Sequence, residues 1–307
     1  MTHVSTPTLG RLSNGQEHAE NEKRLVSVLT PSFNQGRWLK DNLASVATQT
    51  YPHIEHIVVD GGSNDDSVAH LKASESNVRW VSERDRGQSD AINKAFRMSE
   101  GEIIGWLNSD DAYFALDAVE VAVRAFERNP DASVVYGHAA LVDARGLVLH
   151  LVWVPKLNPS LLRLGNYIVQ PSVFVRRSAI NDMLVDEGLD FVMDRDLWLR
   201  LAAVGPFVRV NRILAIDRHQ MNRKVITMQE VGDREHAVLA SRYDLPTGIR
   251  TNVVRKARKL HYRVRGIGLI DNACQDLAFE GHIDSRARLL IRQLAIPRAL
   301  MSTGEGG

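Results

Sequence analysis

The sequence has almost no cysteine: Cys274 is the single one among 307 residues. One cysteine excludes an internal disulfide and a zinc site built from several thiolates. No uninterrupted run of about 18 apolar residues occurs, so a membrane-spanning helix is not expected. The opening residues contain no apolar signal core, and we therefore expect a reducing, cytosolic compartment.

Two nucleotide-binding motifs are also missing. The chain contains neither GxGxxG nor GxxxxGKS, which disfavours a dinucleotide site and a P-loop. Its basic residues lack the interleaved aromatic side chains on which bases stack, so nucleic acid is not an expected partner.

The composition is that of a folded globular protein, with 44% hydrophobic and 24% charged residues. Net charge is +1, but residues 242–307 hold 12 Lys or Arg against 6 Asp or Glu, which leaves the preceding part acidic. We expect a mobile polar tail over residues 1–23, a working domain over 24–227 and a helical basic extension over 228–307.

Short β-rich runs alternate with helical patterns from Arg24 onward. The predicted strands cover 25–30, 53–60, 78–81 and 103–107, and the predicted helices lie near 38–48, 89–98 and 116–128. This alternation predicts an α/β fold with parallel strands and crossover helices. Later strands at 133–137, 141–143, 148–154 and 207–216, with a helix near 194–204, indicate a mixed sheet.

Polar residues follow three of these strands. They read TPSFN at 30–34, DGGSND at 60–65 and NSDD at 108–111. Ligands of open parallel sheets bind beyond the carboxyl ends of the strands, so the three loops could share one rim. The alternative is that they are ordinary turns, which favour the same residue types.

Adjacent carboxylates after an apolar strand suit a divalent cation. Asp110 and Asp111 would supply oxygen ligands to Mg²⁺ or Mn²⁺ and leave positions for water and phosphate. The alternative is a helix N-terminus before Leu116, where aspartates also stabilise the helix dipole.

Three further places could carry chemistry. Ser89 could cap a helix that sets Asp90 on its first turn, or the stretch is a solvated charged face. Asp194 stands at a helix start with Trp198 one turn away, as a base and a stacking ring for a sugar hydroxyl would. His219 alone reads as a solvated loop histidine.

Together these residues resemble the inverting glycosyltransferases of family 2, which have the GT-A fold. The resemblance covers roughly residues 24–224. It is carried by the three loops above and by DRGQSDAIN at 85–93, QPS at 170–172, DRDLWLR at 194–200 and His219.

The resemblance implies a role for each matching position. Its donor-binding positions are Thr30, Pro31, Ser32, Asp60, Arg86, Asp90, Asn108 and Ser109. Asp110 and Asp111, with His219, would hold Mn²⁺ or Mg²⁺. Trp198 and Gln170 would lie on the acceptor side, and Asp194 would be the base.

Two positions depart from the family pattern: Asn108 replaces the first Asp of the metal motif, and Met193 stands where Glu often precedes the base. Asp196 is thus a second candidate base, although it should point away from Asp194 on the helix.

The implied reaction moves a sugar from a nucleoside-diphosphate donor to a hydroxyl of a glycan, polysaccharide or lipid-linked acceptor, with inversion in one displacement. The metal would offset the charge of the leaving diphosphate while Asp194 takes the hydroxyl proton. A non-catalytic nucleotide-sugar-binding member of the fold is the alternative, and a nucleotidyltransferase is a weaker one. The sequence does not specify the nucleotide, the sugar or the acceptor.

Residues 249–267 have helical spacing with an apolar stripe flanked by Arg and Lys. Such a helix could lie on the anionic inner face of a membrane, where lipid-linked acceptors reside. It could instead pack on the working domain with its basic face in solvent, which is the interpretation we favour.

Overall fold

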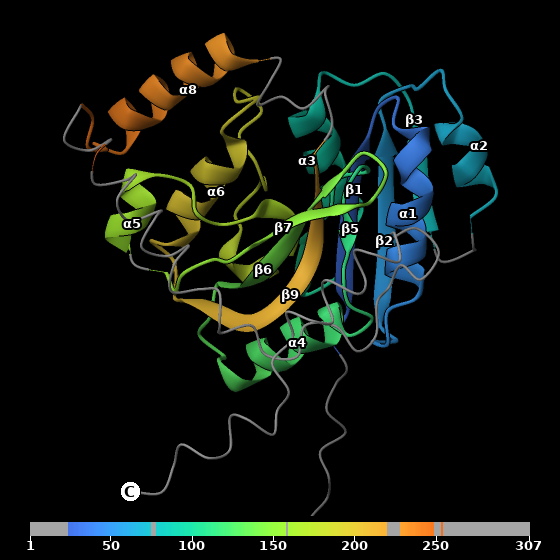
Figure 1. Ribbon diagram of the computed structural model, residues 1–307, viewed down its shortest axis with the longest axis horizontal. Helices are drawn as coiled ribbons and strands as arrows, with labels where there is room; N and C mark the ends of the chain where they lie inside the picture. Colours follow the sequence, from blue (N-terminus) through green and yellow to red (C-terminus); the bar gives the residue numbers. More distant parts are fainter. Residues whose placement is uncertain (1–23, 75–77, 158, 220–227, 249–252, 254–307) are drawn as a thin grey trace, which may run out of the picture.

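A computed structural model describes residues 24–74, 78–157, 159–219, 228–248 and 253 (Figure 1). Within these residues nine strands form one sheet, in the order β3-β2-β1-β4-β8-β6-β9-β5, with β7 paired to β6. The strands are β1 (Val26–Ser32), β2 (Ile54–Asp60), β3 (Val78–Ser82), β4 (Ile103–Trp106), β5 (Ala112–Tyr113), β6 (Val134–Asp143), β7 (Val148–Val152), β8 (Val173–Arg176) and β9 (Phe207–His219). The helices are α1 (Gly36–Ala47), α2 (Ser67–Lys72), α3 (Gln88–Met98), α4 (Ala118–Arg128), α5 (Pro159–Leu164), α6 (Met193–Leu201) and α8 (Gln229–Arg242).

The first half of the sheet is parallel, as the alternating pattern predicts. β1 pairs with β2 on one side and with β4 on the other, and β2 pairs with β3. All seven residues of β1 are buried, as expected for a central strand that is covered on both faces. Ser32 at the end of β1 lies opposite Asp60 at the end of β2. The polar loops after these strands therefore leave the same edge of the sheet.

The second half is mixed, which confirms the α/β prediction of a mixed sheet. β8 runs antiparallel to both β4 and β6, whereas β6 and β9 run parallel over most of their length. β9 also pairs antiparallel with β5, directly after the Asp110-Asp111 pair. Strand β9 thus brings Asp217 and Arg218 next to that pair.

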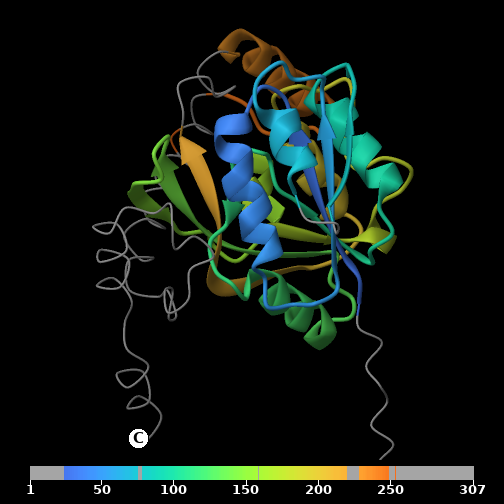
Figure 2. The same ribbon diagram turned by 90° about the vertical axis from the view of Figure 1, so that its right-hand side faces the viewer.

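Helices cover both faces of the sheet (Figures 1 and 2). α3 and α6 contribute Ile92 and Leu197 to a core that includes Leu29 and Ile57 of the sheet. On the other face, α1 and α4 pack on alternate strand residues such as Val28. The alternation follows from the two-residue period of a strand.

Helix α8 lies beside α6, on the side of the molecule away from α1 and α2 (Figure 1). Leu239 of α8 is fully buried in the same core cluster as Leu197 and Trp198 of α6. The first helix beyond residue 227 therefore packs on the predicted working domain. The domain limits 1–23, 24–227 and 228–307 stay predictions. The tail over 1–23 and all but Val253 of the basic segment 249–267 lie outside the described residues.

Several sequence-based predictions were wrong in detail. The strands expected at 133–137 and 141–143 are one strand, β6, in which Gly137 marks a shift of register: a Cβ there would lie 2.6 Å from Leu214. α4 begins at Ala118, and strand β5 lies between this helix and the Asp110-Asp111 pair. The two aspartates therefore do not form the helix N-terminus that was the alternative to a metal site. Ser89 does not cap α3, because Gly87, with a φ of 117°, holds the N-cap position. The pattern also missed α2, α5, β5 and β8.

None of the helices in the described ranges combines the length and the apolar character needed to cross a bilayer.

Candidate functional site

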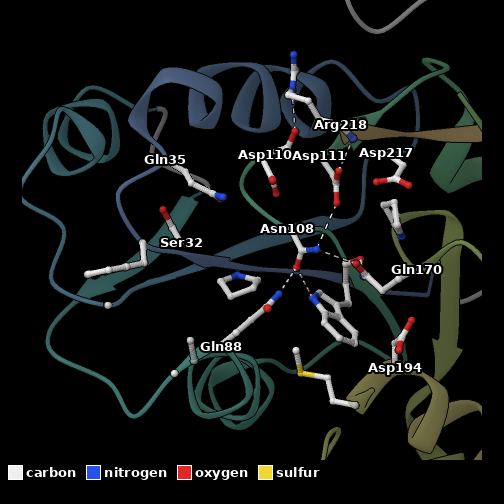
Figure 3. Close-up of a pocket in the computed structure, with 18 of the residues that line it drawn as sticks. Ser32, Gln35, Gln88, Asn108, Asp110, Asp111, Gln170, Asp194, Asp217 and Arg218 are labelled. Atoms are coloured by element: carbon white, nitrogen blue, oxygen red, sulfur yellow. Dashed lines mark hydrogen bonds between the residues drawn. The ribbon is translucent and has the colours of Figure 1, made fainter. Parts of the chain in front are cut away.

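The loops that leave the carboxyl ends of β1, β2 and β4 surround a cavity of about 800 Å³. The other walls are formed by the loop before α3 and the first residues of that helix, the start of α6, the turn before β8 and the end of β9 (Figure 3). Of the predicted site residues, those that line it are Pro31, Ser32, Asn108, Asp110, Asp111, Gln170 and Asp194. The volume is in the range of a small-molecule site. In Figure 3, Asp110 and Asp194 lie on opposite sides of Asn108.

Asn108 lines the cavity and connects several of its other residues by hydrogen bonds. Its Oδ1 accepts hydrogen bonds from Gln88 Nε2 at 2.7 Å and from Trp106 Nε1 at 2.8 Å. Its Nδ2 donates to Gln170 Oε1 at 2.9 Å and to Asp111 Oδ2 at 3.3 Å. All the hydrogen-bonding positions of an amide are used. An Asp at this position could not donate to the Asp111 carboxylate and would place a second negative charge beside it.

Arg218 of β9 holds the Asp110-Asp111 turn. Its guanidinium donates to the Asp110 carbonyl oxygen at 2.8 Å and to Asp41 Oδ2 of α1 at 2.9 Å, and its backbone N–H donates to Asp111 Oδ1 at 3.0 Å. The Arg218 side chain is only 3% exposed. A buried cation that is paired and hydrogen-bonded in this way fixes the turn from behind.

Asp194 is the second residue of α6 and is half-buried. Its carboxylate accepts hydrogen bonds from Asn166 Nδ2 and from the Arg195 backbone N–H, both at 2.6 Å. Apolar side chains of Ile168, Phe191 and Met193 line the same cavity. Burial raises the pKa of the Asp194 carboxyl to about 6, and these hydrogen bonds oppose the rise only in part. A carboxyl of this kind is ionised at pH 7 yet close to the pKa that suits a general base.

Asp196 faces the other way. Both of its oxygens are engaged: Oδ2 accepts from Arg200, and Oδ1 accepts from Arg242 and from the Tyr243 hydroxyl. The residue is fully buried and does not line the cavity. Between the two candidate bases, the geometry favours Asp194.

Three predicted donor residues are buried behind the cavity wall. Thr30 is fully buried and bonds to His56 Nε2 at 2.9 Å, where burial lowers the pKa of His56 to about 3. Asp60 is also buried and accepts hydrogen bonds from the Ser63 and Ser82 hydroxyls, which fixes the turn after β2. Ser109 is buried and donates to Gln35 Oε1. The hydrogen bonds of these residues hold together the loops that form the cavity wall. Their role in donor binding stays a prediction.

Arg86 and Asp90 form an ion pair of 2.9 Å at the start of α3, outside the cavity lining. The hydrogen bond from Arg86 lowers the pKa of Asp90. Arg86 also pairs with Glu187 at 2.7 Å, which links α3 to the loop that leads to α6.

The two predicted acceptor residues differ in position. Gln170 lines the cavity and bonds to Asn108. Trp198 is 1% exposed in the core beneath α6, so it could shape the acceptor side only through its neighbours. His219 is exposed at the end of β9 and outside the lining, although it follows the lining residues Asp217 and Arg218.

Sequence reasoning missed Gln88, Arg218 and Asp217 as residues of this site. Gln88 and Arg218 act through side chains from elements distant in sequence, and no local pattern signals such contacts. Asp217 and Arg218 directly precede His219 in the sequence, so the residue types around the predicted metal ligand are the one local signal for them.

Two carboxylates of the cavity could bind Mg²⁺ or Mn²⁺ together with water and a substrate phosphate. Asp110 and Asp217 bring carboxylates to the same cavity. Within the described ranges no three acidic, histidine or cysteine side chains gather closely enough to hold an ion by themselves. One or two carboxylates completed by water and substrate phosphates is the usual arrangement for Mg²⁺. The residues therefore suit a metal that arrives with a phosphorylated ligand.

Two of the solved structures that share this fold are complexes with a nucleotide sugar. S. aureus TarS 1-349 in complex with UDP-GlcNAc is 18% identical, with a TM-score of 0.53 over 65% of this chain and 60% of that one. Mannosyltransferase PcManGT from Pyrobaculum calidifontis, in complex with GDP-Man and Mn²⁺, is 15% identical, with a TM-score of 0.54 over 94% of this chain and 77% of that one. At these identities the likeness concerns the fold, which is the GT-A fold that the resemblance implies.

Sequence comparison identifies the family. Chondroitin synthase of Escherichia coli is 29% identical over 193 residues, which are 62% of this chain and 28% of that protein, so this chain spans less than a third of that relative. The family model described as glycosyl transferase family 2 matches residues 27–182, about half of the chain. The chain belongs to glycosyl transferase family 2.

Proposed function

We propose that this glycosyltransferase moves a sugar, of the hexosyl type, from a nucleoside-diphosphate donor to a hydroxyl group of a glycan, polysaccharide or lipid-linked acceptor, with inversion and with a divalent metal. One observation carries the proposal: a single cavity is lined by Asp110 after β4 and by Asp194 at the start of α6. A leaving group and an attacking hydroxyl need opposite walls of such a cavity.

The donor side is supported by Ser32. Its Oγ is buried, has no hydrogen-bond partner among the described residues, and belongs to a residue that lines the cavity. A buried hydroxyl without a partner costs free energy, which a bound polar ligand would recover. The complexes of TarS with UDP-GlcNAc and of PcManGT with GDP-Man and Mn²⁺ support a nucleotide sugar as that ligand.

Asp110 and Asp217 are the residues that would hold the metal, and a bound Mn²⁺ or Mg²⁺ would offset the charge that develops on the leaving diphosphate. Asn108 would not be a ligand, because its amide is already committed to four protein partners. Metal ligation by Asp111 or His219 remains part of the prediction.

Asp194 would accept the proton of the attacking hydroxyl. Asn166 orients the carboxylate by a hydrogen bond, and a pKa of about 6 leaves it ionised at neutral pH. Attack from the face opposite the leaving group inverts the anomeric carbon in one displacement and needs one base. The apolar wall of Ile168, Phe191 and Met193 would exclude water from that face.

A screen tests the proposal. The full chain is incubated with UDP-, GDP- and dTDP-sugars, with Mn²⁺ or with EDTA, and both thermal shift and sugar release are measured. We expect one donor class to raise Tm and to turn over only with metal, and NMR of the fresh product to give an inverted anomeric configuration. A retained configuration, or no response to any donor, would contradict the proposal.

The second candidate is a nucleotide-sugar-binding member without turnover. The neutral, fully bonded Asn108 favours it, since it removes one carboxylate from the metal motif. Thermal stabilisation by a donor, without transfer to any hydroxyl acceptor, would support this second candidate.

A cytoplasmic site of action at the inner face of a membrane stays a prediction from the sequence. Flotation of the full chain with anionic and with neutral liposomes tests the membrane contact. Equal flotation with both would count against it.

A further inference from the structure

Helix α8 and the part of the chain that carries Asp194 both lie beyond the segment that matches the family model, and the two are in contact. Glu235 of α8 accepts three hydrogen bonds from consecutive backbone N–H groups. Oε1 accepts from Asp190 at 2.8 Å, and Oε2 accepts from Phe191 at 2.8 Å and from Val192 at 3.1 Å. Glu235 is 8% exposed.

These N–H groups stand at the entrance to α6. Val192 is the N-cap residue of that helix, and its own side chain makes no capping bond. The first N–H groups of a helix have no partners within the helix, and a carboxylate near them is favoured by the helix dipole. Glu235 therefore holds, from 43 residues further along the chain, the backbone that leads into α6 and includes its N-cap residue.

A charged carboxylate suits three donors better than an amide does. Ionised Glu offers two acceptor oxygens, whereas Gln offers one oxygen and an NH₂ group that would face a backbone N–H. Replacing Glu235 by Gln would leave at least one buried donor unpaired.

A second contact places α8 directly behind the cavity wall. Gly232 allows a close approach to Phe191, which lines the cavity: a Cβ at position 232 would lie 2.9 Å from two atoms of the Phe191 ring. One turn further, the His236 ring meets Phe191 edge to face, with centroids 6.1 Å apart. α8 thus holds both the backbone and the ring of residue 191.

We propose that Glu235 is a positioning residue for Asp194, and that α8 is the element that sets the acceptor wall of the site. The inference rests on the proposed role of Asp194 as the base. By holding residues 190–192, Glu235 fixes the direction in which α6 begins and so where the Asp194 carboxylate stands. A displacement of about 1 Å in such a group can cost on the order of 100-fold in rate.

The test compares Glu235→Gln with Glu230→Gln in the full chain. Both substitutions remove one negative charge from α8, but Glu230 is exposed. With the donor selected by the screen and with Mn²⁺, we expect Glu235→Gln to lower kcat by about 10- to 100-fold and to leave the donor KM within about threefold. Glu230→Gln should match the wild type.

Glu235→Asp keeps the charge on a shorter arm and guards against a variant that does not fold. We expect a smaller loss of kcat, again with little change in donor KM. An unchanged kcat in Glu235→Gln, or a fall in kcat matched by an equal rise in donor KM, would overturn the proposal.

Amide hydrogen exchange separates this inference from the proposed function. Exchange over residues 190–192 should quicken in Glu235→Gln and stay at the wild-type rate in Glu230→Gln. Unchanged exchange in Glu235→Gln would refute the positioning role. A wild-type chain that transfers no sugar would refute the proposed function instead, and the exchange comparison would still decide whether Glu235 holds this segment.

Discussion

The parallel half of the sheet and the mixed half place their polar residues by different means. After β2, Asp60 is fixed by its own loop and the adjacent strand end, through Ser63 and Ser82. Asp194 depends on Asn166, 28 residues away, and its helix depends on Glu235 of α8. The turn after β2, on the proposed donor side, is thus held by its own loop and a neighbouring strand end, whereas the proposed base is held by distant segments. Substitutions should therefore affect the two sides separately.

The largest expected effect is that of Asp194→Asn on the acceptor side. Loss of a general base typically costs 10²- to 10⁴-fold in rate, so we expect kcat to fall about 1000-fold, while the donor Kd from calorimetry stays unchanged. Asp182→Asn, at an exposed position in the same half, is the control. Near-normal turnover in Asp194→Asn would remove this residue from the mechanism.

Asp110→Asn should impair metal binding rather than the base. A metal contributes several kcal/mol of charge stabilisation, so we expect kcat/KM to fall about 100-fold or more. The Mn²⁺ concentration that gives half-maximal activity should rise. EDTA should abolish activity in the wild type, and added Mn²⁺ should restore it. Full activity with EDTA present would contradict a metal at Asp110.

Asp196→Ala should destabilise the fold without removing the base. It would leave Arg242, which keeps its bond to Asp186, and Tyr243 without their shared partner, and a hydrogen bond to a charged group contributes about 2 kcal/mol. Urea unfolding should show this loss, and the folded variant should keep kcat within about tenfold of the wild type. A stable variant with no activity would instead make Asp196 the better candidate for the base.

The raised pKa of Asp194 predicts two pH effects. Activity should fall about tenfold per pH unit below about 6, as the base becomes protonated. Since the folded state binds this proton more tightly than the unfolded chain does, ionisation lowers stability as pH rises from about 4 to above 6.

Asp194→Asn escapes that loss. It should therefore gain up to about 3 kcal/mol over the wild type at pH 8 relative to pH 4, measured by urea unfolding at both values. If the difference in unfolding free energy between Asp194→Asn and the wild type were the same at pH 4 and pH 8, the pKa of Asp194 would not be raised.

The smallest expected effect belongs to the donor side. Ser32→Ala removes one hydroxyl that would bond to the donor, so we expect the donor KM to rise about 2- to 10-fold with kcat nearly unchanged. Thr48→Ala, at the exposed C-cap position that follows α1, should leave both constants unchanged. A fall in kcat with an unchanged donor KM would contradict a role of Ser32 in donor binding.

The difference between the two halves also explains what the sequence could predict. The parallel strands and the loops at Ser32, Asp60 and Asn108 follow from local periodicity and turn residues. Strand β6 was divided wrongly, because Gly137 reads as a break although it permits close contact with β9. The support of Asp110 by Arg218 and of α6 by Glu235 has no local signature, since each contact joins residues more than 40 positions apart.

A crystal structure of the full chain with the selected nucleotide sugar and Mn²⁺ would show whether Asp110 and Asp194 act on one substrate. We expect the manganese ion, located by its anomalous scattering, beside Asp110, and the anomeric carbon between that ion and Asp194. A nucleotide sugar bound outside this cavity, or with its anomeric carbon turned away from Asp194, would contradict it.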